Sequence, residues 1–189
     1  LFRSGQLKKL LDHLGYQVID GAHHHPERTV VFLGDYIDRG PDVGETLRVV
    51  RAMVDAGTAI ALMGNHEYNA LAWFTPRPDS DLPCRRHTPD RHEQFRASLE
   101  SLGDEIEHWI EWFRTCPLWL DTPRFRAVHA SWDPRARDFM ANSLAGQDAV
   151  FTTSVVQETS VPGSPAFRAI EHLLKGREID LPTGVVKIG

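Results

Sequence analysis

Hydrophobic positions follow two patterns along the chain, a helical spacing and short unbroken runs. The helical spacing predicts helices over residues 6–14, 43–56, 93–102, 105–113 and 166–175, with a further helical stretch that ends at residue 71. The short apolar runs predict buried strands over residues 29–33, 58–63 and 125–128. From residue 29 onward, strand, polar loop and helix alternate twice. This order predicts an α/β fold in which helices flank a sheet of parallel strands.

Residues 75–92 interrupt this alternation. The segment holds four prolines, which predicts an inserted loop without regular structure. It is also basic, with Arg85, Arg86 and His87 in one group and Arg91 with His92 in another. Two interpretations stay open, a basic lip over a phosphate-binding crevice or an exposed insert.

The composition, with 41% hydrophobic and 25% charged residues, fits one globular domain over residues 1–189. A formal charge of -5 argues against adhesion to nucleic acid or to an anionic membrane. No apolar run approaches the roughly 20 residues of a membrane-spanning helix, and no signal-peptide pattern opens the chain. With only two cysteines, these features predict a cytoplasmic protein. Because the chain starts at Leu1 and stops after an apolar stretch, we expect the domain to be incomplete at both ends.

Polar clusters follow all three predicted strands. The first cluster is GDYIDRG at residues 34–40, the second is GNHE at residues 64–67, and the third begins at His129. In an open α/β sheet the carboxyl ends of parallel strands converge on one crevice, so we expect the clusters to meet. Asp, Asn and His side chains bind divalent metal ions, and two ions about 3.5–4 Å apart can clamp a phosphate. The sequence therefore predicts a metal and phosphate site.

The GDYIDRG and GNHE motifs, 30 residues apart, together resemble the calcineurin-like metallophosphoesterase superfamily, and most closely its phosphoprotein (Ser/Thr) phosphatase branch. HASWDP at residues 129–134 resembles the next histidine motif of that family. The resemblance spans residues 5–134 and implies a metallophosphoesterase-like layered sheet with flanking helices, four layers (α/β/β/α) in the intact domain. It also implies two divalent metal ions as cofactors, with manganese or iron expected and zinc as a further option.

The resemblance assigns the metal ligands residue by residue. Asp35 would bridge both metal ions, and Asn65 and His129 would bind the second ion. Arg39 and Asn65 would contact the phosphate of the substrate.

The resemblance also implies a hydrolytic reaction, in which metal-bound hydroxide attacks the phosphorus directly. His66 would be the general acid that protonates the leaving oxygen, and Asp38 would orient it. Glu67 would support the loop, and Arg39 would stabilise the charge that develops on the phosphate.

The sequence departs from the family pattern at two places. The family opens with Asp-x-His-Gly, and aligning its glycine to Gly5 puts Phe2 and Ser4 where the two metal ligands are expected. The late Gly-His-x-His segment has no counterpart after His129, so the first metal ion would keep only Asp35. Either the chain is a fragment of a longer protein or the site is degenerate.

The function that follows is metal-dependent hydrolysis of phosphate monoesters, with a phosphorylated protein or a small phosphorylated molecule as substrate. One alternative is hydrolysis of a dinucleoside polyphosphate or other nucleotide, because the same metal pair serves esters and anhydrides. The other alternative is a non-catalytic phosphate-binding relative that lacks the first metal site.

Other conspicuous residues suggest structural roles. The three histidines at residues 23–25 lie in a polar segment and predict a solvated loop. Trp109 and Trp112 have helical spacing and predict core packing or a capping layer. Neither Cys84 nor Cys116 has neighbours that would activate it as a nucleophile.

Overall fold

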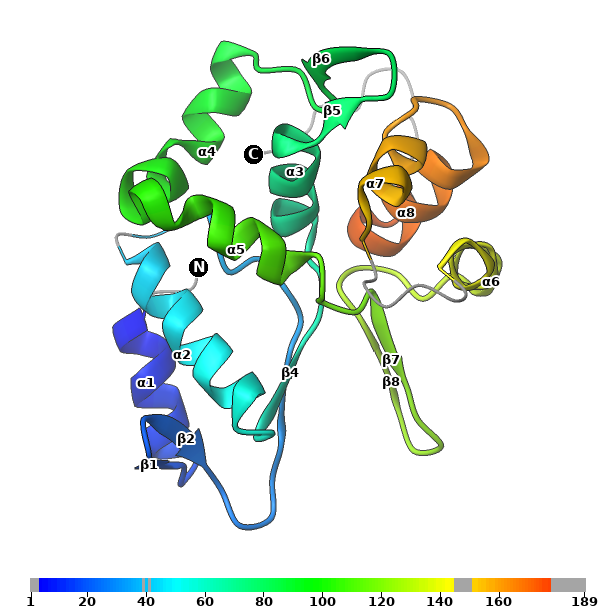
Figure 1. The fold of residues 1–189 in the computed structure, drawn as a ribbon. Coiled ribbons are helices and arrows are strands. Elements are labelled where there is room, and N and C mark those ends of the chain that lie inside the picture. The colour runs from blue at the N-terminus through cyan, green and yellow to red at the C-terminus, as the bar shows by residue number, and fades with distance from the viewer. Residues whose placement is uncertain (1–3, 39, 41, 145–150, 178–189) are drawn as a thin grey trace, which may run out of the picture.

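The computed structural model describes residues 4–38, 40, 42–144 and 151–177, and these residues form a mixed α/β structure (Figure 1). The helices are α1 (Ser4–His13), α2 (Val43–Asp55), α3 (Asn65–Phe74), α4 (Pro89–Leu102), the 3₁₀ turn η1 (Gly103–Glu105), α5 (Ile106–Phe113), α6 (Pro134–Ser143), α7 (Thr153–Thr159) and α8 (Pro165–Lys175). The strands are β1 (Gln17–Ile19), β2 (Ala22–His24), β3 (Val30–Phe32), β4 (Ala59–Ala61), β5 (Pro76–Arg77), β6 (Ser80–Pro83), β7 (Trp119–Asp121) and β8 (Arg126–Val128). The predicted α/β class is confirmed.

The centre of the fold is the parallel pair β3 and β4, connected through α2. Val30 pairs with Ala59 and Phe32 with Ala61, as the two predicted apolar runs indicated. A parallel connection needs a crossover of a dozen or more residues, which α2 supplies. Both strands therefore end at the same edge, directly before the GDYIDRG and GNHE loops.

Helices pack around this pair and bury its side chains. In Figure 1, α1 and α2 lie side by side at one side of β4, whereas α6, α7 and α8 lie at the other side. Trp109 and Trp112 of α5 are both buried in the core, as their spacing predicted. Within the described segments, no helix is both long enough and apolar enough to cross a membrane.

The predicted third strand is present, but its expected parallel pairing is wrong. β8 pairs antiparallel with β7, with Trp119 opposite Val128, and the two strands form a separate hairpin. The Thr122 hydroxyl donates to the carbonyl of Phe125 and accepts that residue's N–H, which closes the turn. The apolar run at residues 125–128 predicted a strand correctly, but periodicity carries no information about the partner of a strand.

The predicted irregular loop at residues 75–92 is wrong in part. β5 and β6 form a short antiparallel hairpin, and α4 already begins at Pro89. The prolines do not prevent this, because Pro76 and Pro83 lie at the ends of a two-stranded ribbon. Pro89 occupies the first turn of α4, where a missing N–H leaves no helical hydrogen bond unmade.

Two of the three consecutive histidines lie in regular structure, which corrects the predicted solvated loop at these two positions. His23 and His24 belong to β2, and His23 is buried. Asp20 and Gly21 both have positive φ angles and make the two-residue turn that joins β1 to β2. The Asp-Gly pair was the signal in the sequence for this hairpin.

Candidate metal centre

Two glycines bring the loops after β3 and β4 into backbone contact. A Cβ atom at Gly34 would overlap the backbone of Gly64, and a Cβ at Gly64 would overlap the backbone nitrogen of Asp35. Gly34 also has a φ of 97°, in the left-handed region that glycine adopts without strain. The two loops can therefore touch only because Gly34 precedes Asp35 and Gly64 precedes Asn65, where any larger residue would clash.

Glu67 fastens the two loops together from inside the protein. Its carboxylate is fully buried and accepts the backbone N–H groups of Asp35 at 2.8 Å, Tyr36 at 2.7 Å and Ile37 at 3.3 Å. It also accepts the N–H of Gly64 at 3.2 Å. Burial raises the pKa of Glu67 to about 7, and the charge of Asp35 adds to that rise, against the opposing pull of the N–H donors. The supporting role expected for Glu67 has a structural basis in these four bonds.

The loop held by Glu67 has an unusual backbone. Asp35 and Asp38 have φ angles of 61° and 69°, a conformation that non-glycine residues rarely adopt. Tyr36, between them, is buried, and its hydroxyl donates to the carbonyl of Leu62 at 2.8 Å and accepts the N–H of Gly34 at 3.1 Å. Tyr36 therefore ties the ends of β3 and β4 together, a role that the sequence did not indicate.

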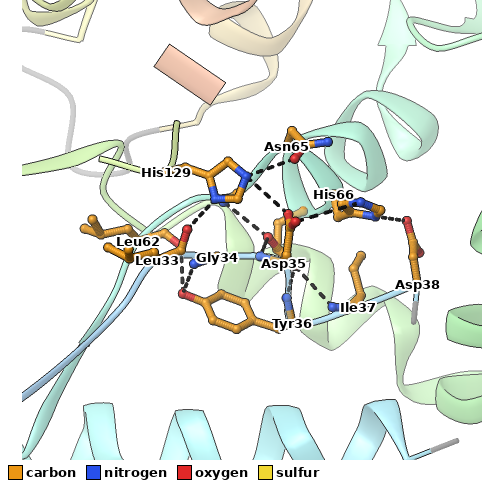
Figure 2. A network of polar contacts seen from close by, with 12 residues as sticks. Leu33, Gly34, Asp35, Tyr36, Ile37, Asp38, Leu62, Asn65, His66 and His129 are labelled. Atoms are coloured by element: carbon orange, nitrogen blue, oxygen red, sulfur yellow. Dashed lines mark hydrogen bonds and ion pairs between the residues drawn. The ribbon is translucent and has the colours of Figure 1, made fainter. Parts of the chain in front are cut away.

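Three predicted metal ligands converge at the mouth of these loops (Figure 2). The Nε2 atom of His129 lies 2.9 Å from Oδ1 of Asn65 and 3.4 Å from Oδ1 of Asp35. The other ring nitrogen of His129, Nδ1, contacts the carbonyl oxygen of Leu33. A carbonyl only accepts, so Nδ1 carries the hydrogen, and a neutral ring then presents the lone pair of Nε2 to Asn65 and Asp35.

This arrangement fits a bound cation. Oδ1 of Asp35 is buried and receives no hydrogen bond, so a carboxylate oxygen, an amide oxygen and an imidazole lone pair face one point without a donor. Oxygen and imidazole ligands of this kind suit a divalent transition metal ion, and the bond from His129 to Leu33 resembles the outer-shell contact that orients a ligating histidine. Over the described residues, no group of three or more His, Cys, Asp or Glu side chains forms a further metal site. The described side chains thus bring three candidate ligands for one ion together.

His66 and Asp38 form a second unit on the other side of Asp35. Nδ1 of His66 lies 2.6 Å from Oδ2 of Asp38, whereas Nε2 of His66 faces Asp35 at 4.0 Å. Burial lowers the pKa of His66, but the hydrogen bond to Asp38 and the nearby carboxylates outweigh it, so the pKa lies above the ordinary value. This pair can hold a proton on Nε2, directed toward the candidate metal site.

Ser98 completes this unit, although no motif in the sequence marks it. Its buried hydroxyl accepts the N–H of Asp38 at 2.8 Å and donates to Oδ1 of Asp38 at 2.7 Å. Ser98 lies in α4, 60 residues from Asp38, so only the packing of α4 against the loop reveals the contact.

The remaining predicted site residues lie apart from this cluster or outside the described part of the chain. Arg39 and Phe2 are outside the described residues. Ser4, aligned with a family metal ligand, begins α1 and donates its hydroxyl hydrogen to Asp42 at 3.3 Å.

Comparison with known proteins adds evidence independent of this geometry. The family model of calcineurin-like phosphoesterases matches residues 3–151. A bis(5'-nucleosyl)-tetraphosphatase (asymmetrical) of Halalkalibacterium halodurans is 28% identical over 169 residues, which cover 86% of this chain and 66% of the relative. The bis(5'-nucleosyl)-tetraphosphatase (asymmetrical) of Bacillus subtilis is 27% identical over 164 residues, which again cover 86% of this chain and 66% of the relative.

A shorter part of the chain matches a bis(5'-nucleosyl)-tetraphosphatase (symmetrical) of Janthinobacterium. It is 32% identical over 113 residues, which cover 58% of this chain and 35% of the relative. The chain thus spans 66% or less of the length of these three relatives.

Proposed function

Because the chain belongs to the calcineurin-like phosphoesterase family, we propose that it carries the metal site and the general acid of a hydrolase that cleaves dinucleoside polyphosphates. The single observation that carries this proposal is the convergence of Asp35, Asn65 and His129 beside the His66–Asp38 pair. It combines a site for a cation with a proton donor, the two requirements for cleaving a phosphate ester or anhydride.

Each side chain has a specific part in this proposal. Asp35, Asn65 and His129 hold a divalent metal ion, which when bound neutralises phosphate oxygens and makes the phosphorus a better electrophile. His66 donates its Nε2 proton to the oxygen that leaves, and Asp38 fixes the orientation of the ring and stabilises its charged form. Arg39, proposed from its motif position, binds the phosphate oxygens.

The substrate assignment differs from the phosphomonoester reading that the motifs favoured. The relatives named above are bis(5'-nucleosyl)-tetraphosphatases, which supports the alternative of a dinucleoside polyphosphate. A phosphoprotein substrate has no support from these relatives. The family generally employs two divalent ions, so we propose a second ion that shares Asp35, with manganese or iron in the native enzyme.

A substrate panel tests the proposal directly. The intact protein, loaded with Mn²⁺, is assayed on diadenosine tetraphosphate, an aryl phosphate and a phosphopeptide, and we expect the first to have the highest kcat/KM. Preference for the phosphopeptide would contradict the substrate assignment, and phosphate binding without turnover would favour the non-catalytic alternative.

Two variants test the site within the same assay. Asp35→Asn should abolish both Mn²⁺ binding, measured by calorimetry, and turnover, because the negative charge of the carboxylate is lost. His66→Asn should keep Mn²⁺ binding but lower kcat by about 10²–10⁴-fold, the usual contribution of a general acid. His13→Asn, an exposed histidine at the end of α1, serves as the control and should behave as wild type. Wild-type rates in the first two variants would refute the site.

A further inference from the structure

A cavity of about 800 Å³ lies beside helix α3, the helix that begins with Asn65 and His66. One part of its lining comes from α3, the β5–β6 hairpin and the segment that follows this hairpin. The other part comes from α7, α8 and the loop between them, which lie next to α3 and the hairpin in Figure 1. Its volume lies in the range typical of small-molecule sites. The proposed chemistry at Asp35 and His66 uses none of its lining residues.

Helix α3 connects the cavity to the metal centre. Asn65 and His66 occupy its first turn, and Asn69 lies one turn later, about 6 Å along the axis. Arg85 donates to Oδ1 of Asn69 at 2.8 Å, and Asn69, Arg85 and Arg91 line both this cavity and a smaller one that reaches Asp38. Asn69, Arg85 and Arg91 therefore link the lining of the cavity to that of the space at Asp38, which has a volume of only about 10 Å³.

The cavity carries an excess of positive charge. Its lining includes Arg77, Arg85, Arg86, Arg91 and Lys175 but only two carboxylates, Asp79 and Glu171. Across the described parts of the chain, none of these four arginines forms an ion pair, whereas Arg48, Arg51 and Arg96 each do. Burial, and then the charge of Arg91, lower the pKa of Arg85. A bound anion would relieve this repulsion, and arginine suits phosphate oxygens because of its planar array of donors.

The lining from α7, α8 and the loop between them is partly apolar. Val161, Pro162 and Phe167, from α8 and the loop before it, line the same space as the arginines. Lys175 is held by Glu171 at 2.6 Å, which leaves the arginine side as the anion-binding wall. A ligand that fits both parts of the lining carries several phosphates at one end and an apolar, flat group at the other.

We propose that this cavity binds the nucleoside polyphosphate portion of the substrate that extends away from the metal centre. The phosphate chain lies along Arg85, Arg86 and Arg91, and the nucleoside packs against Phe167 and Val161. This inference rests on the proposed function, since it identifies the part of the same substrate that the metal centre does not hold. An inorganic polyphosphate shares the phosphate chemistry but lacks the group for the apolar part of the lining.

Binding in the presence of a chelator tests the cavity apart from the metal centre. The intact protein in EDTA is titrated calorimetrically with ATP and with inorganic tripolyphosphate, and we expect ATP to bind at least about tenfold more tightly. The double variant Arg85→Gln/Arg86→Gln should weaken ATP binding by roughly 10- to 100-fold, as expected for lost charged hydrogen bonds. Phe167→Ala should weaken ATP binding but not tripolyphosphate binding.

The matched control is Arg124→Gln/Arg135→Gln, which removes two exposed arginines that lie outside the cavity lining. ATP affinity should stay within about twofold of wild type. Equal weakening in both double variants, or no weakening in the cavity variant, would overturn the proposal, because binding would then reflect net charge or another surface. Equal affinity for ATP and tripolyphosphate would overturn the nucleoside assignment.

The outcomes separate this inference from the proposed function. Hydrolysis of diadenosine tetraphosphate by a protein whose cavity variant binds ATP normally would leave the function standing and refute the cavity. ATP binding that depends on Arg85 and Arg86, in a metal-loaded protein that cleaves no substrate, would support the cavity and refute the function.

Discussion

The two neighbouring regions of this molecule differ in how their charged groups are partnered. At the metal centre, the carboxylate of Glu67 is enclosed by four backbone N–H donors, and Ser98 and His66 bind Asp38 from two sides. In the cavity beyond Asn69, four arginines face an open space without a carboxylate partner among the described residues. The polar groups around Glu67 and Asp38 are bonded within the protein, whereas Oδ1 of Asp35 accepts no hydrogen bond and the four arginines form no ion pair among the described residues.

This difference shows how stability and recognition are divided between the two regions. A buried network whose polar groups are all bonded is rigid, and its rigidity fixes the positions of Asp35 and His66. Unpaired arginines contribute little to the folded state, but they provide charge to an incoming phosphate without first breaking an ion pair. Substitutions in the bonded network should therefore mainly lower the stability of the protein. Substitutions of the cavity arginines should mainly weaken ligand binding.

The largest effect is expected from Glu67→Leu. This change leaves four buried N–H groups without an acceptor and should lower the free energy of unfolding by about 4 kcal/mol, measured by urea denaturation. Glu67→Gln keeps one acceptor oxygen and should lose about half as much, because the carboxyl, with its pKa of about 7, is itself partly neutral at neutral pH. A leucine variant within 1 kcal/mol of wild type would show that Glu67 does not hold the loops.

Gly64→Ala should have the next largest effect. The added methyl group would lie 2.5 Å from the backbone nitrogen of Asp35 and from Oε2 of Glu67, so the loops must separate. We expect a loss of about 2–3 kcal/mol of stability together with weaker Mn²⁺ binding. The control is Gly5→Ala in α1, where nothing lies within 4 Å and alanine should be neutral or slightly stabilising. Equal stability of the two variants would contradict the steric argument.

Ser98→Ala tests whether Ser98 positions Asp38 in the His66–Asp38 pair. Without the hydroxyl, Asp38 loses both of its bonds to Ser98 and keeps only the one to His66, so we expect kcat to fall about tenfold with KM within about twofold. Ser101→Ala, on the same helix, removes a hydroxyl that bonds only Gly44 and should leave both constants unchanged. A parallel loss of stability in both variants without a selective fall in kcat would assign Ser98 a purely structural role.

The smallest effect on stability is expected in the cavity. Arg91→Gln removes a charge that repels Arg85 and should change the free energy of unfolding by less than about 0.5 kcal/mol. Arg114→Gln provides the contrast, because Arg114 bonds the carbonyl of Phe151 at 2.9 Å and pairs with Glu111, and its loss should cost about 1–2 kcal/mol. A strongly destabilised Arg91 variant would mean that this arginine supports the fold.

The candidate site was predictable where its residues follow strands in short motifs. The runs before Asp35 and Asn65 are apolar and the motifs are local, so their spacing placed both residues at one edge of the parallel pair. His129 was also expected there, although its strand belongs to a hairpin rather than to the parallel sheet. Its position depends on contacts with Leu33 and Asn65 that its own strand does not dictate.

Local sequence was enough to identify the residues of the candidate site, because glycine, carboxylate and histidine residues directly after apolar runs form short motifs. Tertiary structure alone decided that β8 pairs with β7, that Ser98 binds Asp38, and that residues 77–91 meet residues 157–175 around a cavity. These contacts join segments that are distant in the chain. They depend on which surfaces remain to be buried after the local elements form. The hydrophobic periodicity of one segment does not show which other segment will cover it.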